Sequence, residues 1–271
     1  HNFLDLLPPH LTSLSHSKTS KMQNELMLNF PASLLESLRS CHLLLSSSTP
    51  LPVGGSTING EYASPPTLQF PMHLRRMHWQ GPMAWLKDAS ASALRSLTIQ
   101  FSYMHSTNSN AYQLEPEIFP YLTKLKILSL SRLSDETPYP PNLTSLTIYT
   151  NASWRTFAKL PSRLTAFNLR VDGANREQPW LTFPPQLRDL TVRYAHPWKP
   201  EVWAALPRSL IHLHSDRSGI EMADIDSQHL PRTLETLAID GGSSASVLGP
   251  VFFEGLGPNL KKVTLGSRTL C

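Results

Sequence analysis

Leucines recur along the chain at fixed spacings within one phrase, whose skeleton is Pro-x-x-Leu-x-x-Leu-x-Leu. Between Tyr139 and Asp240 the first leucine of each copy follows the previous one by 21, 23, 23 and 24 residues, at Leu143, Leu164, Leu187, Leu210 and Leu234. Side chains alternate along a β-strand, so the leucines point inward and the residues that flank the last two point outward. Stacked copies therefore predict a parallel sheet with one buried and one exposed face.

Weaker copies of the phrase extend over nearly the whole chain. They bring the total to about eleven units, and their first leucines are Leu11, Leu38, Leu74, Leu94, Leu125 and Leu260. This period is typical of leucine-rich repeats. The phrase resembles the Leu-Pro-x-x-Leu-x-x-Leu-x-Leu repeats of bacterial effector proteins and the irregular repeats of amoebal proteins. The resemblance implies an α/β solenoid, a leucine-rich repeat horseshoe of about eleven units. Its parallel β-sheet would be concave, and its convex side would consist of loops and short helices.

Two details of the pattern affect the expected arrangement. In the unit anchored at Leu125, we take Leu125, Leu128 and Leu130 as the inward positions. The Asn that usually follows the third inward residue of such repeats by three positions occurs only as Asn151, after Ile148. In the other units, other groups or water must therefore satisfy the backbone of that turn.

The repeats predict a single domain over residues 1–271. Two steps are longer than the rest, 36 residues from Leu38 to Leu74 and 31 from Leu94 to Leu125. We expect loops inserted there, near 45–66 and 103–114, where Ser, Pro, Gly and Asn are frequent. Because the chain begins with His1, we expect a fragment or the ordered part of a longer chain. Proline is tolerated at a helix start, so Pro200 predicts a helix of one to two turns within Lys199–Leu206.

The composition and charge of the chain limit the classes of partner that it can bind. The chain is 40% hydrophobic and only 16% charged, with a net charge of +4. No run of Lys or Arg occurs, which argues against nucleic acid binding, since phosphate tracking needs clustered cations. Nucleic acid recognition stays as an alternative through scattered cations on the exposed face, namely Arg76, Arg170, Arg193 and Lys262.

Sequence features that mark a compartment are few. No stretch has the apolar length of a membrane span, and the start does not resemble a signal peptide. Extracellular leucine-rich repeat proteins usually carry disulfide-pinned caps, whereas the two cysteines here, Cys41 and Cys271, lie far apart. Cys41 occupies an inward position and is expected to be a buried thiol. These features favour an intracellular, cytoplasmic protein, and secretion stays open.

The outward positions of the middle units hold the candidate partner-binding residues. Neighbouring strands lie about 4.8 Å apart, so Arg170 and Arg193 should be adjacent. Arg and Tyr are favoured at interface hot spots. The predicted contact residues are Tyr149, Arg170, Arg193, Asp189, His212, His214, Asp216 and Asp240. In the competing interpretation, Arg193, Asp189 and Asp216 only neutralise one another.

One constellation suggests chemistry, His212-x-His214-x-Asp216 on a single strand face. Two histidines at i and i+2 with a nearby carboxylate can hold a metal, but a flat strand splays its side chains apart. The sequence contains no nucleophile elbow, zinc-protease motif, dinucleotide fingerprint or Cys-x-x-Cys pair. We therefore expect no catalysis, no cofactor and no metal. A metal-dependent enzyme using these residues is retained as an alternative.

Together these features predict a module for protein-protein recognition or scaffolding, which binds a protein partner on the concave face or the inserted loops. The resemblance also allows the substrate-recognition part of a ubiquitin ligase, or a subunit of a larger complex. At the C-terminal end Leu265 and Leu270 lack a polar closing element. We expect an exposed sheet edge there unless a neighbouring chain covers it.

Overall fold

Strands dominate the part of the chain that the computed structural model describes, which comprises residues 8, 10–16, 37–44, 73–80, 86, 93–100, 116–128, 138–150, 160–171, 182–194, 198, 200–216, 227–240, 254–266 and 268–270. These residues contain twelve strands: β1 (Ser13–His16), β2 (Ser40–Leu44), β3 (Arg76–Gln80), β4 (Ser96–Gln100), β5 (Lys124–Leu128), β6 (Ser145–Thr150), β7 (Ala166–Val171), β8 (Asp189–Tyr194), β9 (His212–Asp216), β10 (Thr236–Asp240), β11 (Lys262–Leu265) and β12 (Arg268–Leu270). The described helical segments are short: α2 (Pro200–Ala204) and the 3₁₀ turns η4 (Pro116–Ile118) and η7 (Ser227–His229).

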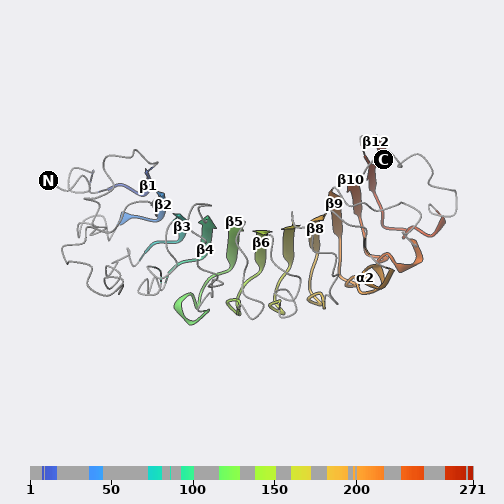
Figure 1. Cartoon of the computed structure of the whole chain (residues 1–271), viewed down its shortest axis with the longest axis horizontal. Coiled ribbons are helices and arrows are strands. Elements are labelled where there is room, and N and C mark those ends of the chain that lie inside the picture. The colour runs from blue at the N-terminus through green and yellow to red at the C-terminus, as the bar shows by residue number, and fades with distance from the viewer. Residues whose placement is uncertain are drawn as a thin grey trace, which may run out of the picture.

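The strands form one sheet in which spatial order equals sequence order, from β1 to β12. Each strand from β1 to β11 pairs in parallel with the next, whereas β12 pairs antiparallel with β11. Figure 1 shows the strands side by side along an arc, with the two chain ends at opposite ends of the row. The described chain is thus a parallel β-solenoid of stacked coils, as the repeats predict.

The core lies on one side of the sheet and repeats from unit to unit. In β7 the inward residues Phe167, Leu169 and Val171 are at most 2% exposed, while the residues between them are partly exposed. The first leucine of the phrase lies just before each repeat strand and is buried, as at Leu143, which is 0% exposed, except in the two terminal units, where Leu11 and Leu260 are partly buried. The period-two alternation explains this division, because only every second side chain reaches the interior.

Buried prolines set the turn before each strand in the middle of the chain. The carbonyl of Pro161 accepts a hydrogen bond from the Leu164 amide at 3.1 Å, and the same contact joins Pro140, Pro184, Pro207 and Pro231 to their leucines. Proline suits this position, because the turn uses the carbonyl and needs no N–H. In the last repeat Gly257 takes that place. A Cβ there would come within 3.0 Å of the Arg232 backbone, so only glycine fits without displacement.

A backbone ladder joins each coil to the next. The Thr123 carbonyl accepts the amides of Thr144 and Ser145 at 2.9 and 3.0 Å, and the Thr144 carbonyl accepts those of Thr165 and Ala166 at 2.9 and 3.0 Å. The same paired contact recurs from the Thr12 carbonyl through the Glu235 carbonyl. Backbone groups at the start of each strand are therefore satisfied by the neighbouring coil.

The register predicted for the unit around Leu125 is wrong by three residues. In β5 the inward residues are Leu125 and Ile127, at 2% and 0% exposure, and Leu122 is the first leucine of the phrase. An odd shift exchanges the two faces of a strand. Lys124 and Lys126 therefore face outward in line with β4 and β6, where the sequence interpretation had placed Ile127 and Ser129.

The short helix after β8 confirms the prediction from Pro200. Helix α2 packs Trp203 inward, and the Trp203 ring lies 4.6 Å from that of Trp198, between centroids. No helix in the described residues is both long and apolar enough to cross a bilayer. The expected loops near 45–66 and 103–114 fall outside the described residues, as does Asn151 with its turn.

At the end of the row, β12 covers the edge of the last repeat strand, so the predicted exposed edge of the sheet is that of β12 and not that of β11. Gly266, with a positive φ of 58°, reverses the chain, and its amide donates to the Ile239 carbonyl at 2.8 Å. The chain then returns as β12, which pairs Leu270 with Val263 and Arg268 with Leu265. A segment of the same chain thus occupies the edge of β11, and a neighbouring chain at the edge of β12 stays a prediction.

Cys41 confirms the expectation of a buried thiol. Its side chain is 2% exposed in β2 and forms no disulfide. Desolvation by burial raises the pKa of the Cys41 thiol to about 12. The thiol therefore stays protonated and unreactive at neutral pH. Cys271 lies outside the described residues.

Candidate partner-binding surface

The predicted contact residues lie on the outward side of five consecutive strands, β6 to β10. We use the name partner surface for this set: Tyr149, Arg170, Arg193, Asp189, His212, His214, Asp216 and Asp240. The described side chains are partly or fully exposed. For Asp216 the structure describes the backbone position but not the side chain.

One row of the partner surface crosses the strands in register. Tyr149 on β6 pairs with Arg170 on β7, and Arg170 pairs with Arg193 on β8. The row continues through Asp216 to Asp240. The predicted adjacency of Arg170 and Arg193 is confirmed. Their alignment follows from repeats with equal strand lengths and an unbroken parallel ladder.

The tyrosine in this row lies between two cations. The Lys126 Nζ is 5.8 Å from the centroid of the Tyr149 ring, and the Arg170 Cζ is 5.9 Å from it. Both distances are within the range of a cation–π attraction. A partly exposed aromatic ring with a cation from each neighbouring strand close to it loses less conformational freedom when it contacts a partner than an isolated ring would.

The histidines of β9 pair with carboxylates on opposite neighbouring strands. His212 Nε2 lies 3.8 Å from an oxygen of Asp189 on β8, and His214 Nε2 lies 3.0 Å from an oxygen of Asp240 on β10. These side chains are 43 to 54% exposed, so water screens both pairs. The two rings interact in opposite directions along the sheet instead of converging on one point.

That geometry bears on the metal-site alternative. A metal needs three or four converging ligands and a supporting shell. Within the described part of the chain, no group of three or more His, Cys, Asp or Glu could hold an ion. The ligand set of His212, His214 and Asp216 is therefore not assembled by the side chains that the structure describes.

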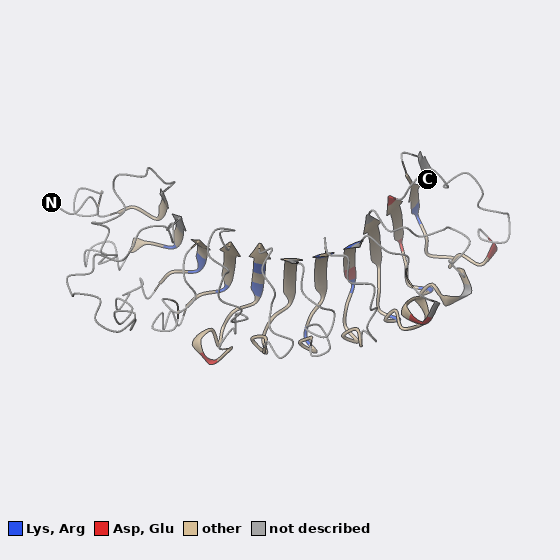
Figure 2. Cartoon of the chain, viewed as in Figure 1, with Lys and Arg blue, Asp and Glu red and all other residues tan. Residues whose placement is uncertain are grey.

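Sequence reasoning missed two lysines beside the partner surface, Lys124 and Lys126, because of the register error in β5. The triplet Leu122-x-x-Leu125-x-Ile127 fits the phrase directly and was the available signal. Figure 2 shows cations on β3, directly before β4 and on β5, and carboxylates on strands toward the C-terminus. The described residues between 73 and 128 include a single carboxylate, Glu117. Over the same range they include five cations: Arg75, Arg76, Arg95, Lys124 and Lys126.

The cations named for nucleic acid binding do not form one cluster. Arg76 lies on β3 and Lys262 on β11, eight strands apart in the sheet. At about 4.8 Å per strand the separation is roughly 38 Å along the row. Only Arg170 and Arg193 of that set are neighbours.

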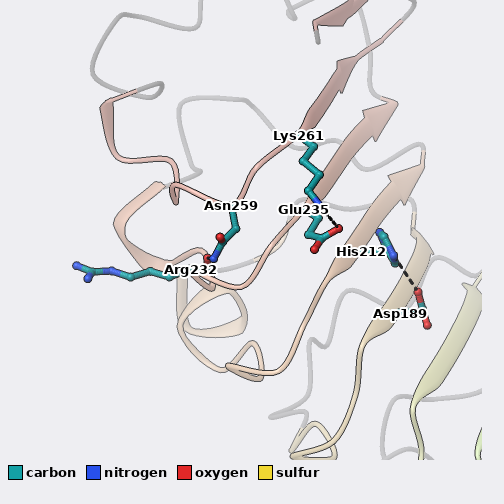
Figure 3. A network of polar contacts seen from close by, with 6 residues as sticks. All are labelled: Asp189, His212, Arg232, Glu235, Asn259 and Lys261. Carbon is teal, nitrogen blue, oxygen red and sulfur yellow. Dashed lines mark hydrogen bonds and ion pairs between the residues drawn. The ribbon is translucent and has the colours of Figure 1, made fainter.

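Side chains at the turns also join successive coils. The residue before the first leucine donates to a carbonyl of the preceding turn, from Asn142 to Pro120 at 2.8 Å and from Asn259 to Arg232 at 3.0 Å. Figure 3 shows Asn259 beside Arg232, with the ion pair of Lys261 and Glu235 at 2.9 Å nearby. The pattern alone did not reveal these contacts, because the residue types at this position vary.

Comparison with known proteins adds no relative from which a function could be carried over. The chain matches no protein-family model, and no curated protein matches it significantly.

Proposed function

We propose that this chain is a leucine-rich repeat protein that recognises a protein partner on its partner surface and catalyses no reaction. The observation that carries the proposal is the row formed by Tyr149, Arg170 and Arg193, which the register aligns on three adjacent strands. The row combines the residue types that dominate interface hot spots with partial exposure.

The leucine-rich repeat assignment is supported by how the phrase maps onto the coils. From Leu143 to Leu234, each copy supplies one turn, one buried first leucine and one strand of the sheet. The proposed architecture is a horseshoe of about eleven units with the exposed sheet face on its concave side. Such solenoids offer a large preformed surface to a partner. An intracellular location and a single domain over 1–271 belong to the same proposal.

The preformed strands favour tight recognition. Association must offset the entropy lost when side chains and loops become ordered at the interface. Residues on rigid strands are already ordered in the free protein, so this cost is smaller for them. The Asp–His pairs on either side of β9 add donors and acceptors at the margin of the row. The Tyr149 ring supplies apolar area at the β6 end of the row, where exclusion of water by a partner would strengthen the neighbouring polar contacts.

A capture experiment with matched variants tests this proposal. The chain and a triple variant, Tyr149→Ala with Arg170→Glu and Arg193→Glu, are immobilised and exposed to an extract of the source cells with chemical crosslinking. A captured protein is then purified, and its Kd is measured for both chains. Since truncating hot-spot residues commonly removes 2 kcal/mol or more, the triple variant should bind at least about thirtyfold more weakly.

The control variant carries Arg208→Glu and Arg232→Glu, at exposed turn positions away from the partner surface. It should keep the affinity of the original chain within about threefold, because charges outside the contact mainly alter steering. Circular dichroism and thermal unfolding check that all variants remain folded. Equal binding by the triple variant and the original chain would remove the partner surface as the contact.

A further inference from the structure

A groove runs along the turn edge of the sheet, beside the amino ends of β4 to β8, and shares no lining residue with the partner surface. It is open to solvent and has a volume of about 370 Å³. One wall consists of residues that precede the first leucine of each unit, Tyr121, Asn142, Arg163 and Gln186. The other wall consists of residues that follow a first leucine, Arg95, Thr123, Thr144 and Thr165. We call this feature the turn groove.

Both arginines of the turn groove are held in place by the protein. Arg95 Nη1 donates to the Tyr121 carbonyl at 3.0 Å, and its guanidinium lies 4.8 Å from the centroid of the Tyr121 ring. Arg163 Nη1 donates to Asn142 Oδ1 at 2.9 Å, and Asn142 itself is bound to the Pro120 carbonyl. A guanidinium has five N–H donors, so most donors of each arginine remain for a ligand.

The electrostatics of the turn groove favour an anion. No carboxylate lines it, and two cations do. The further cations Arg76 and Lys124 begin β3 and β5, and Arg75 directly precedes β3. Tyr121, which is 50% exposed, adds an apolar contact beside Arg95. The lining residues thus supply positive potential and include no carboxylate.

The threonine wall distinguishes between kinds of anion. The hydroxyls of Thr123, Thr144 and Thr165 donate to backbone carbonyls of the preceding coil, at 3.1, 3.2 and 3.0 Å. With their protons engaged, these oxygens offer lone pairs to a ligand. A peptide has N–H groups to pair with them. A phosphate chain presents oxygens instead. These are hydrogen-bond acceptors and cannot donate to the threonine oxygens.

We propose that the turn groove binds an extended acidic segment of a protein. Its Asp or Glu carboxylates pair with Arg95 and Arg163, and its backbone amides pair with the threonine oxygens. Three steps between strands span about 14 Å, the length of about four extended residues. The segment therefore places two carboxylates against the arginines and its backbone along the threonines. This site stands whether or not the partner surface binds a protein.

Fluorescence anisotropy with the full chain tests the site. The probe is a short labelled peptide that alternates Asp and Ser, and the comparison peptide has Asn in place of each Asp. Measurements at about 0.15 M salt limit the contribution of distant charges. The chain should bind the Asp peptide, and Arg95→Gln with Arg163→Gln should weaken binding at least about tenfold, because two charge-assisted contacts are lost.

The matched control, Arg208→Gln with Arg232→Gln, removes the same charge from exposed turns outside the groove. It should bind the Asp peptide within about twofold of the original chain. The triple variant of the partner surface should also retain this binding, which separates failure of one site from failure of the other. Equal affinity for the Asn peptide, or equal loss in the control, would overturn the proposal.

A labelled single-stranded oligonucleotide of equal charge completes the experiment. Weaker binding than that of the Asp peptide supports a protein ligand. Tighter binding that is lost in Arg95→Gln with Arg163→Gln would instead assign the turn groove to a phosphate chain and overturn the proposal.

Discussion

The inward and outward faces of the same strands differ in how strongly contacts with neighbouring coils restrict the residue types at each position. On the inward face, each position meets its equivalents in adjacent coils, and Leu, Ile, Val or Phe occupies most of these positions, with Cys41, Met77, Trp79 and Ser215 as exceptions. On the outward face the row from Tyr149 to Asp240 holds five residues of three types in the same backbone positions. The stack therefore fixes the interior, and the exterior is left to carry specificity.

The largest difference in the loss of stability is expected between substitutions of Ile127 and of its neighbour Leu128. Ile127 is 0% exposed and Leu128 faces outward. Ile127→Ala should lower the free energy of unfolding by about 2–5 kcal/mol, because it opens a cavity in the core. Leu128→Ala should change it by less than about 1 kcal/mol. Urea unfolding followed by circular dichroism measures both, and the reverse ranking would restore the register that begins at Leu125.

Cys41, a second inward residue, should make the free energy of unfolding depend on pH. Burial raises the pKa of the Cys41 thiol to about 12, whereas an unfolded thiol ionises near about 8.5. The folded state thus holds its proton where the unfolded state loses it. Stability from this group is complete below about pH 8.5 and falls above it by about 1.4 kcal/mol per pH unit, until the folded thiol itself ionises. Unfolding titrations at several alkaline pH values measure the slope.

The matched chain for that experiment is Cys41→Ala, which lacks the thiol and should lose less stability over the same alkaline range. Identical slopes in the two chains would show that Cys41 ionises while the protein is folded. That result would place Cys41 on the accessible side of the sheet and break the contrast between the two faces.

The turn edge is intermediate between the two faces. Thr144 is half-buried and donates to the Thr123 carbonyl at 3.2 Å. Thr144→Val preserves the shape and removes this hydrogen bond, so it should destabilise the chain by about 1 kcal/mol. Thr147, on the outward face, is the comparison. Thr147→Val should shift the thermal midpoint less, and a larger shift from Thr147→Val would contradict this ranking.

The smallest effect is expected on the outward face itself. Asp240→Ala breaks the contact with His214, in which both side chains are more than 40% exposed. Solvent screening limits the loss to less than about 1 kcal/mol. A double-mutant cycle with His214→Ala isolates the pair energy. A coupling well above that value would indicate a rigid network on this face.

The repeating interior was predictable from sequence, and its single error is instructive. Leu122, Leu125, Leu128 and Leu130 offer two sets with acceptable spacing, and leucine alone does not distinguish them. The β-branched Ile127 fits an inward strand position and the proline turn is replaced by Phe119, whose carbonyl accepts the Leu122 amide at 3.2 Å. The backbone ladder selects one register, because every strand must align with two neighbours.

Other features depend on contacts that no periodic pattern encodes. The stacking of Arg95 on Tyr121 joins residues 26 positions apart at variable places in the repeat. The return strand β12 spans only three residues, too few for alternation to be recognised. For the partner surface, spacing predicted which residues share a row. Neither spacing nor register identifies the molecule that they contact.

The reversal at Gly266 also changes the sheet edge that the described chain offers to another molecule. Stacked parallel strands are a template onto which another molecule could add in the same direction, and repeated addition would give an open filament. Because β12 is antiparallel to β11, a strand added at this end would pair with a strand of opposite direction that is only three residues long. One short reversal thus reduces the edge available for strand addition beside β11 to the three residues of β12.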